Sequence, residues 1–254
     1  MPAASVLGTT IKTRKMSEKN TSGQQGLSTT FVALAATFCV CLIASNLFVP
    51  RLWAVGNTSL QLTGAVVIFP ISYIINDLLT EVYGYRRAMF VIWIGFVLSA
   101  FVALAEQLVC WLPAPLYEEN REVADSFNRL FGLVPRTTAA SLLAFIAGSQ
   151  LNAWVMSKMK VATGGRGFGW RAILSSVFGE LCDSVVFYPL AFAGILPLKA
   201  ILLLVAMQVV VKTLYEVVVL PLTSALAKKL KRSEGIDTFD YDISYNPFRI
   251  KDNN

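Results

Sequence analysis

Histidine is absent from this chain of 254 residues, cysteine occurs only four times, and charged side chains make up only 15% of it. Without histidine the chain lacks the commonest general base, and no Gly-Lys-Ser/Thr phosphate-binding pattern is present for ATP hydrolysis. Metal binding has little support, because Cys39 and Cys41 point to different faces of a helix and no imidazole completes a site. We therefore expect no enzyme, no metal site and no cofactor. An intramembrane enzyme that uses acidic side chains is the remaining catalytic alternative.

Hydrophobic residues account for 55% of the chain and gather in long segments. A helix needs about 20 apolar residues to cross the hydrocarbon core of a bilayer. Six such segments lie near 29–49, 60–83, 88–111, 137–157, 172–195 and 200–227. The sequence therefore predicts an all-α polytopic membrane protein with six transmembrane helices. The first three spans would enter the membrane from one side and the last three from the other, which fits two inverted repeats. A six-helix bundle without an internal repeat stays equally open.

The positions of lysine and arginine predict the orientation of the spans. With both termini in the cytosol, 16 of the 22 basic residues lie in cytosolic segments and only 5 in outer loops. We therefore expect a multi-pass protein of the cytoplasmic (inner) membrane with both termini cytosolic. The same distribution explains the net charge of +6, so no nucleic acid partner is expected.

The polar segments outside the spans define the expected domains. Residues 1–28 are rich in serine, threonine, glycine and lysine, which predicts a disordered cytosolic tail, and translation starts at Met1 or at Met16. Residues 29–227 form the six-helix transmembrane domain, and 228–254 form a cytosolic C-terminal tail. The basic run from Lys228 to Arg232 is expected to contact anionic lipid headgroups.

Two carboxylates, Asp77 and Glu81, lie near the end of the second apolar segment. A charge inside hydrocarbon is costly unless it faces a partner or a wet cavity, so such residues indicate that something polar binds there. Residues four apart share a helix face, and both groups can therefore address one ligand. This pattern favours transport. The alternative for Glu81, close to the interface, is a surface ion pair.

The fifth and sixth spans carry the remaining buried charges. Glu180 and Asp183 lie near the midplane, Lys212 lies about 18 Å into the sixth helix, and Glu216 follows one turn later. Lys212 is expected to pair with Glu216, Asp183 or Asp77. Four carboxylates, those of Asp77, Glu180, Asp183 and Glu216, outnumber this single cation by three. Some of them must be protonated, hydrated or reserved for a ligand.

Aromatic rings accompany two of the carboxylates. Tyr73 lies one turn before Asp77, and Phe187 lies one turn after Asp183. A ring and a carboxylate on one face suit a planar heterocycle, which can stack and form hydrogen bonds at the same time. Ordinary helix packing is the alternative for either ring.

Three motifs together resemble those of the queuosine precursor transporter family, once grouped with vitamin-uptake transporters. The first is Phe-Pro-x6-Asp-x3-Glu-x-Tyr-Gly-x-Arg-Arg from Phe69 to Arg87, the second runs from Ser176 to Phe187, and the third is Lys212-x3-Glu216-x4-Pro221. The resemblance covers roughly residues 30–227. Two positions depart from it: Asn152 stands where many relatives carry aspartate, and Glu180 occupies a position that varies between acid and amide.

The resemblance implies uptake of 7-deazaguanines: 7-cyano-7-deazaguanine, 7-aminomethyl-7-deazaguanine or queuine. A guanine-like edge presents adjacent N–H donors that a carboxylate accepts as a fork, so Asp183 or Asp77 is expected to bind it while Phe187 or Tyr73 stacks on the ring. The candidate substrate-binding residues are Tyr73, Asp77, Glu81, Glu180, Asp183, Phe187, Lys212 and Glu216. The alternative within transport is the membrane substrate-binding subunit of an ATP-driven vitamin importer. Self-association stays open.

Overall fold

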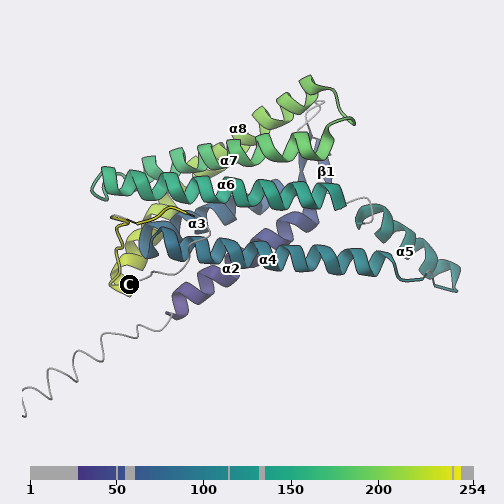
Figure 1. The fold of residues 1–254 in the computed structure, drawn as a ribbon, viewed down its shortest axis with the longest axis horizontal. Coiled ribbons are helices and arrows are strands. Elements are labelled where there is room, and N and C mark those ends of the chain that lie inside the picture. The colour runs from purple at the N-terminus through teal and green to yellow at the C-terminus, as the bar shows by residue number, and fades with distance from the viewer. Residues whose placement is uncertain are drawn as a thin grey trace, which may run out of the picture. The chain divides into compact units, whose positions relative to one another are not determined.

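The computed structural model describes residues 28–49, 51–54, 61–113, 115–131, 135–241 and 243–246. These residues form seven α-helices and one short hairpin (Figure 1). In chain order the elements are α2 (Thr29–Phe48), β1 (Leu52–Ala54), β2 (Gln61–Thr63), the 3-10 helix η1 (Gly64–Val67), α3 (Phe69–Tyr83), α4 (Tyr85–Cys110), α5 (Glu118–Phe131), α6 (Pro135–Ala162), α7 (Phe168–Phe192) and α8 (Leu198–Glu234). The all-α class predicted from the sequence is confirmed.

The chain divides into two compact units within α2, between Ala33 and Leu34. In the first unit, the Ser28 hydroxyl accepts a hydrogen bond of 3.0 Å from the backbone N–H of Phe31. This contact satisfies one of the free N–H groups at the start of α2. All contacts described below lie within the second unit, Leu34–Asn254.

Among the described residues, five helices are long and apolar enough to cross a membrane: α2, α4, α6 over Ala139–Ala162, α7 and α8. The chain is therefore a polytopic membrane protein. The longest, α8, has 37 residues. At a rise of 1.5 Å per residue it is about 55 Å long, well beyond the roughly 30 Å of a hydrocarbon core. It continues past residue 227 and ends at Gly235, whose φ of +64° suits a helix C-terminus.

The segment predicted as the second span has a different form. Within it β2 pairs antiparallel with β1, η1 follows, and α3 begins only at Phe69. Pro70 stands in the first turn of α3, where its missing N–H would have no partner in the helix. α3 has 15 residues, about 22 Å, and is too short to cross the hydrocarbon core. A count of six complete spans therefore stays a prediction.

Helix α3 is enclosed by its neighbours. Every residue from Ser72 to Tyr83 is buried, and α3 packs against α4, α6 and α8. Five polar or charged side chains are buried with it, those of Ser72, Asn76, Asp77, Thr80 and Glu81. Because α3 has so little contact with solvent, the hydrogen bonds and countercharges for these side chains must come from the surrounding helices.

The closest approach of α6 and α7 occurs at two glycines. A Cβ placed on Gly148 would lie 2.7 Å from the carbonyl oxygen of Gly179, and a Cβ on Gly179 would lie 2.8 Å from the Cβ of Asn152. The side chain of Tyr73 from α3 reaches the same point. Small residues allow membrane helices to pack with their backbones close together. Gly148 and Gly179 therefore set the distance between α6 and α7, which run side by side in Figure 1.

The described residues after α8 are bound to the ends of other helices. Asp240 accepts a hydrogen bond of 2.9 Å from the backbone N–H of Tyr85, at the start of α4, and one of 2.5 Å from the Ser157 hydroxyl on α6. A carboxylate is favourable at a helix N-terminus, where N–H groups are free. Gly84 has a φ of +88°, and a Cβ there would lie 2.8 Å from Thr238 Cγ2. Part of the predicted C-terminal tail thus closes the turn between α3 and α4.

We predict that Gly179→Ala lowers the melting temperature of the purified protein, because the added methyl group would meet backbone and ring atoms at the α6–α7 crossing. Overpacking of this kind costs about 1–3 kcal/mol. Gly169→Ala, also in α7, is the matched control, since its Cβ would meet only the flexible end of Leu220 at 3.2 Å. Thermal unfolding in detergent compares the two. Equal melting temperatures would contradict the role given to this crossing.

Candidate functional site

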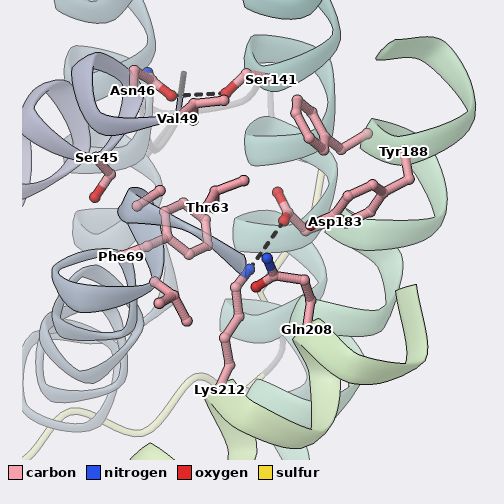
Figure 2. Close-up of a pocket in the computed structure, with 13 residues that line it drawn as sticks. Ser45, Asn46, Val49, Thr63, Phe69, Ser141, Asp183, Tyr188, Gln208 and Lys212 are labelled. Atoms are coloured by element: carbon pink, nitrogen blue, oxygen red, sulfur yellow. Dashed lines mark hydrogen bonds and ion pairs between the residues drawn. The ribbon is translucent and has the colours of Figure 1, made fainter. Parts of the chain in front are cut away.

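A pocket lies among the C-terminal end of α2, the hairpin, η1, and the facing parts of α3, α6, α7 and α8 (Figure 2). Its cavity volume is about 50 Å³, below the roughly 300–1,000 Å³ of small-molecule sites, and it opens to solvent, so a planar heterocycle enters only if the lining side chains move apart. Its lining consists of Ser45, Asn46, Val49, Thr63, Ala65, Val66, Phe69, Ser141, Asp183, Phe187, Tyr188, Gln208 and Lys212. Apolar walls with a few converging polar groups are typical of a binding site for a small organic ligand.

One carboxylate and one ammonium group face each other in this pocket. Lys212 Nζ on α8 lies 3.5 Å from Asp183 Oδ2 on α7, as the dashed line in Figure 2 shows. The same Nζ lies 4.1 Å from the centre of the Phe69 ring, a cation–π contact. Of the three partners predicted for Lys212, the structure has Asp183. The charges balance each other, so the pocket can present a donor and an acceptor side by side.

Aromatic rings stand on two sides of this ion pair. Phe187 and Tyr188 on α7 line the pocket with their ring centres 5.1 Å apart, and Phe69 lines it from α3. Tyr73 is not in the lining. Its ring centre lies 5.4 Å from that of Phe69, and its hydroxyl lies at the Gly148–Gly179 crossing. Of the two rings expected beside a ligand, Phe187 lines the pocket and Tyr73 does not, while Phe69, which was not expected, also lines it.

Sequence reasoning also missed several polar residues of the lining. Ser141 Oγ donates a hydrogen bond of 2.7 Å to Asn46 Oδ1 across the mouth, and Gln208 lies close to the ion pair (Figure 2). Each is an uncharged polar residue within a membrane-length helix, which is a weak signal by itself. Phe69 had a stronger one, because it opens the Phe-Pro motif.

A second polar group lies on the same helices but outside the pocket lining. Asp77, Asn152, Ser175, Ser176 and Glu216 form it, and we call it the buried acidic cluster. Asn152 Nδ2 donates to Asp77 Oδ1 at 3.0 Å. Ser176 Oγ lies 2.9 Å from Glu216 Oε1 and 3.4 Å from Asp77 Oδ2, so it stands between the two carboxylates. Only 1% of Asp77 and 4% of Glu216 is exposed.

Glu180 lies between the pocket and the buried acidic cluster. On α7 it follows Ser176 by four residues and precedes Asp183 by three, which places all three on one face of the helix. Its side chain is buried, and its Oε2 atom has no hydrogen-bond partner among the described residues. A buried carboxyl oxygen without a partner is costly and indicates a functional position.

Glu81, the fifth candidate carboxylate, has both side-chain oxygens bound by basic side chains. Arg171 Nη1 and Nη2 bind its Oε2 and Oε1 atoms at 2.5 and 2.9 Å, and Lys231 Nζ binds Oε1 at 2.5 Å. The side chains of Glu81 and Arg171 are each only 1% exposed. The pairing of Glu81 is therefore buried rather than at the surface, and its two-pronged geometry holds α3 to α7.

The same group of charges continues into the segment after α8. Lys160 Nζ lies 2.6 Å and Lys231 Nζ lies 3.0 Å from Asp237 Oδ1. Lys160 also donates to the carbonyl oxygens of Thr238, at 2.6 Å, and of Glu81. Partial burial alone would raise the pKa of Asp237, but the hydrogen bonds from both lysines outweigh it and hold this pKa below its usual value. We call Glu81, Lys160, Arg171, Lys231 and Asp237 the ion-pair cluster.

Comparison with known proteins places these features in a family. A family described as "Putative vitamin uptake transporter" matches residues 63–226, more than half of the chain. The chain belongs to this family. The match includes the Asp183–Lys212 pair and the whole buried acidic cluster. The family resemblance predicted from the motifs is confirmed, and the protein is a membrane transporter by family.

A curated relative in Bacillus subtilis (strain 168) is named "Probable queuosine precursor transporter". This relative and the present chain are 27% identical over 169 residues, which cover 66% of the present chain and 72% of the relative. No solved structure matches the chain.

We predict that Asp237→Asn lowers thermal stability near pH 7 and that its difference from the wild type disappears in acid. The folded-state pKa of Asp237 is depressed, so its stabilisation is present above the unfolded value of about 3.9 and is lost as the pH falls through the folded value. Melting curves from about pH 7 to pH 3 measure this, with Asp125→Asn on the exposed face of α5 as control. A difference that stays constant across this range would contradict the ion pairing.

Proposed function

We propose that this transporter imports queuosine precursors, the 7-deazaguanines 7-cyano-7-deazaguanine, 7-aminomethyl-7-deazaguanine or queuine, into the cytoplasm for queuosine modification of tRNA. The family match and the name of the Bacillus subtilis relative support this class of substrate. The observation that carries the proposal is the Asp183–Lys212 pair in an aromatic pocket among apolar helices. Transport requires binding and release only, so no catalytic residue is assigned.

The chemistry of the ion pair is complementary to the pyrimidine edge of a 7-deazaguanine. That edge presents a carbonyl oxygen next to a ring N–H and an exocyclic amino group. A carboxylate accepts two adjacent N–H donors as a fork, and an ammonium group donates to a carbonyl. Asp183 therefore binds the N–H and amino groups, and Lys212 binds the carbonyl oxygen. A separation of 3.5 Å between their charged atoms allows both contacts to one planar edge.

The aromatic lining supplies the second half of recognition. Phe69 and Phe187 stand on different helices around the ion pair, and either ring can stack on a flat heterocycle. Tyr73 supports the ring of Phe69 from behind. The remaining candidate residues act at a distance in this proposal: Glu180 next to the pocket, Asp77 and Glu216 in the buried acidic cluster, and Glu81 in the ion-pair cluster.

We further propose that the pocket faces the outside of the cytoplasmic membrane and that both termini are cytosolic. The ion-pair cluster, with Lys160, Arg171 and Lys231, lies where α3, α6 and α8 end and α7 begins, and the pocket lies toward the opposite ends of these helices. Basic residues favour the cytosolic side, which supports this orientation. The run from Lys228 to Arg232 then lies near anionic lipid headgroups. The transporter acts alone or as a self-associated oligomer.

We predict that Asp183→Asn abolishes uptake of queuosine precursors in cells that can neither make nor import them, because an amide cannot accept both N–H groups of the ligand edge. The cells are given each 7-deazaguanine at low concentration, and queuosine in their tRNA is measured. Wild-type protein restores the modification, and the variant reduces it at least tenfold, or about 1.4 kcal/mol of lost binding.

The control for this experiment is Asp125→Asn, which removes an exposed carboxylate on α5. Membrane levels of both variants are compared with the wild type. Normal tRNA modification by Asp183→Asn would refute the assignment of the ligand site. Wild-type activity that requires a separate ATP-driven module in the host would support the subunit alternative instead, and a host without such modules tests this directly.

A further inference from the structure

The two carboxylates of the buried acidic cluster have too few hydrogen-bond donors around them. Asn152 donates one N–H to Asp77. Ser176 is within reach of both carboxylates, yet a hydroxyl has one hydrogen, and Glu216 is nearer at 2.9 Å than Asp77 at 3.4 Å. Ser175 Oγ lies 3.4 Å from Asp77 Oδ1 and is the only further hydrogen-bond donor to this carboxylate among the residues that the structure describes.

Even that donor is directed elsewhere. The hydroxyl of Ser175 lies 2.9 Å from the carbonyl oxygen of Ala172, a shorter contact than the one to Asp77. Within the described residues, Glu216 Oε2 and Asn152 Oδ1 have no hydrogen-bond partner, although both side chains are more than nine-tenths buried. The cluster therefore contains acceptors in excess. A proton on one of the carboxyl groups would supply the missing donor.

The charges around the cluster also indicate that one of its carboxyl groups carries a proton. None of the ion pairs formed by the described residues includes Asp77 or Glu216. The buried basic side chains of the described helices are bound elsewhere: Arg171 to Glu81, Lys160 to Asp237, and Lys212 to Asp183. The other titratable groups described near the cluster are Glu180, Cys182 and Asp183 on α7, Tyr73 on α3 and Lys212 on α8; Lys212 is the one cation among them and is paired with Asp183.

Two carboxylates that share a serine in a water-poor interior cannot both stay ionised without a countercharge. Paired aspartates in other proteins solve the same problem by holding one proton between them. The oxygens here come from α3, α6, α7 and α8, so the position is built by four helices and not by one local stretch of sequence.

The cluster and the pocket are built on the same two helices, α7 and α8. Glu216 lies one turn after Lys212 on α8, and Ser176 lies on the same face of α7 as Asp183. A movement of α7 against α8 that changes the Asp183–Lys212 contact therefore also changes the contact between Ser176 and Glu216. The pocket and the cluster therefore share α7 and α8, the two helices through which binding in the pocket would act on the cluster.

We propose that Asp77 and Glu216 form a proton-binding site and that its proton crosses the membrane together with the substrate. This inference rests on the proposed transport function. In the described state one proton is held between the two carboxyl groups. When the cluster opens to water on the cytosolic side, both groups ionise and the proton leaves, and it is replaced when the cluster next faces outward. Only an O–H bond is broken and re-formed.

A first experiment detects the proton without any substrate. Infrared difference spectra of purified protein, recorded between neutral and alkaline pH, show the stretching band of a protonated carboxyl group. We expect this band in the wild type and its loss in the double variant Asp77→Asn/Glu216→Gln. The matched control is Asp125→Asn/Glu122→Gln, which changes two exposed carboxylates on α5 in the same way. Absence of the band at neutral pH, or its survival in the double variant, overturns the proton site.

A second experiment tests coupling in liposomes that contain purified protein. With an alkaline interior and no membrane potential, one proton carried per neutral substrate gives up to about tenfold accumulation of 7-cyano-7-deazaguanine for each unit of pH difference. The single variants Asp77→Asn and Glu216→Gln lose this accumulation. Exchange of labelled for unlabelled substrate at equal pH on both sides is still measurable in them, which shows that they fold and bind.

The results separate the two proposals. Transport that ignores a pH gradient, or that follows a sodium gradient instead, overturns proton coupling and leaves the proposed function intact. Absence of any 7-deazaguanine transport, with or without a gradient, overturns the proposed function, and the infrared band still decides whether the cluster holds a proton.

Discussion

The burial of α3 determines what the rest of the bundle must provide. Phe69, Tyr73, Asp77 and Glu81 follow one another at intervals of four residues and so lie along one face of this helix. Each lies in a different environment. In the same order, these are the pocket, the α6–α7 crossing, the buried acidic cluster and the ion-pair cluster. In an interior of low dielectric, none of the polar members is tolerated without partners. The neighbouring helices carry polar residues at the matching depths, and this requirement fixes their register against α3.

Three polar layers follow one another along α3: the ion pair of the pocket, the buried acidic cluster and the ion-pair cluster. They differ in how their charges are balanced. At the pocket, one lysine neutralises one aspartate at 3.5 Å, and the pair is loose enough to be shared with a ligand. At the C-terminal end of α3, which we call the far end, Arg171 and Lys231 bind Glu81 through contacts of 2.5 to 2.9 Å. Charged hydrogen bonds this short are the strong ones, so the far end is closed firmly while the pocket stays adaptable. Only the layer between them contains carboxylates without a cation among the described residues.

Much of the fold was predictable from hydrophobic segments, because a helix in lipid must satisfy its own backbone and therefore needs a long apolar run. The second span was harder. Its apolar count includes β2 and η1, and hydropathy does not distinguish a strand or a 3-10 turn from the first turns of a helix. The length of α3 therefore became clear only from the structure.

The site was predictable in composition and less so in geometry. Helical spacing placed Asp183 and Lys212 at similar depths, and the structure pairs them. The same spacing could not decide between Tyr73 and Phe69 as the pocket ring, because the choice depends on how α3 is rotated against the Gly148–Gly179 crossing. Contacts between residues distant in the sequence leave no local signal at all, and the Glu81–Arg171 pair, 90 positions apart, is of this kind.

The buried acidic cluster lies along α3 between the pocket and the ion-pair cluster. This position suits it to respond when the transporter changes conformation. A ligand moving from the pocket along α3 would reach Asp77 and Glu216 before it reached the ion-pair cluster. Water that entered with it would remove the reason for holding a proton, since hydrated carboxylates ionise readily. Two negative charges beside the cations at Glu81 would then weaken the pairs that keep the far end closed. In the proposed mechanism, deprotonation and opening of the far end therefore favour each other, which is the coupling that a proton-driven importer requires.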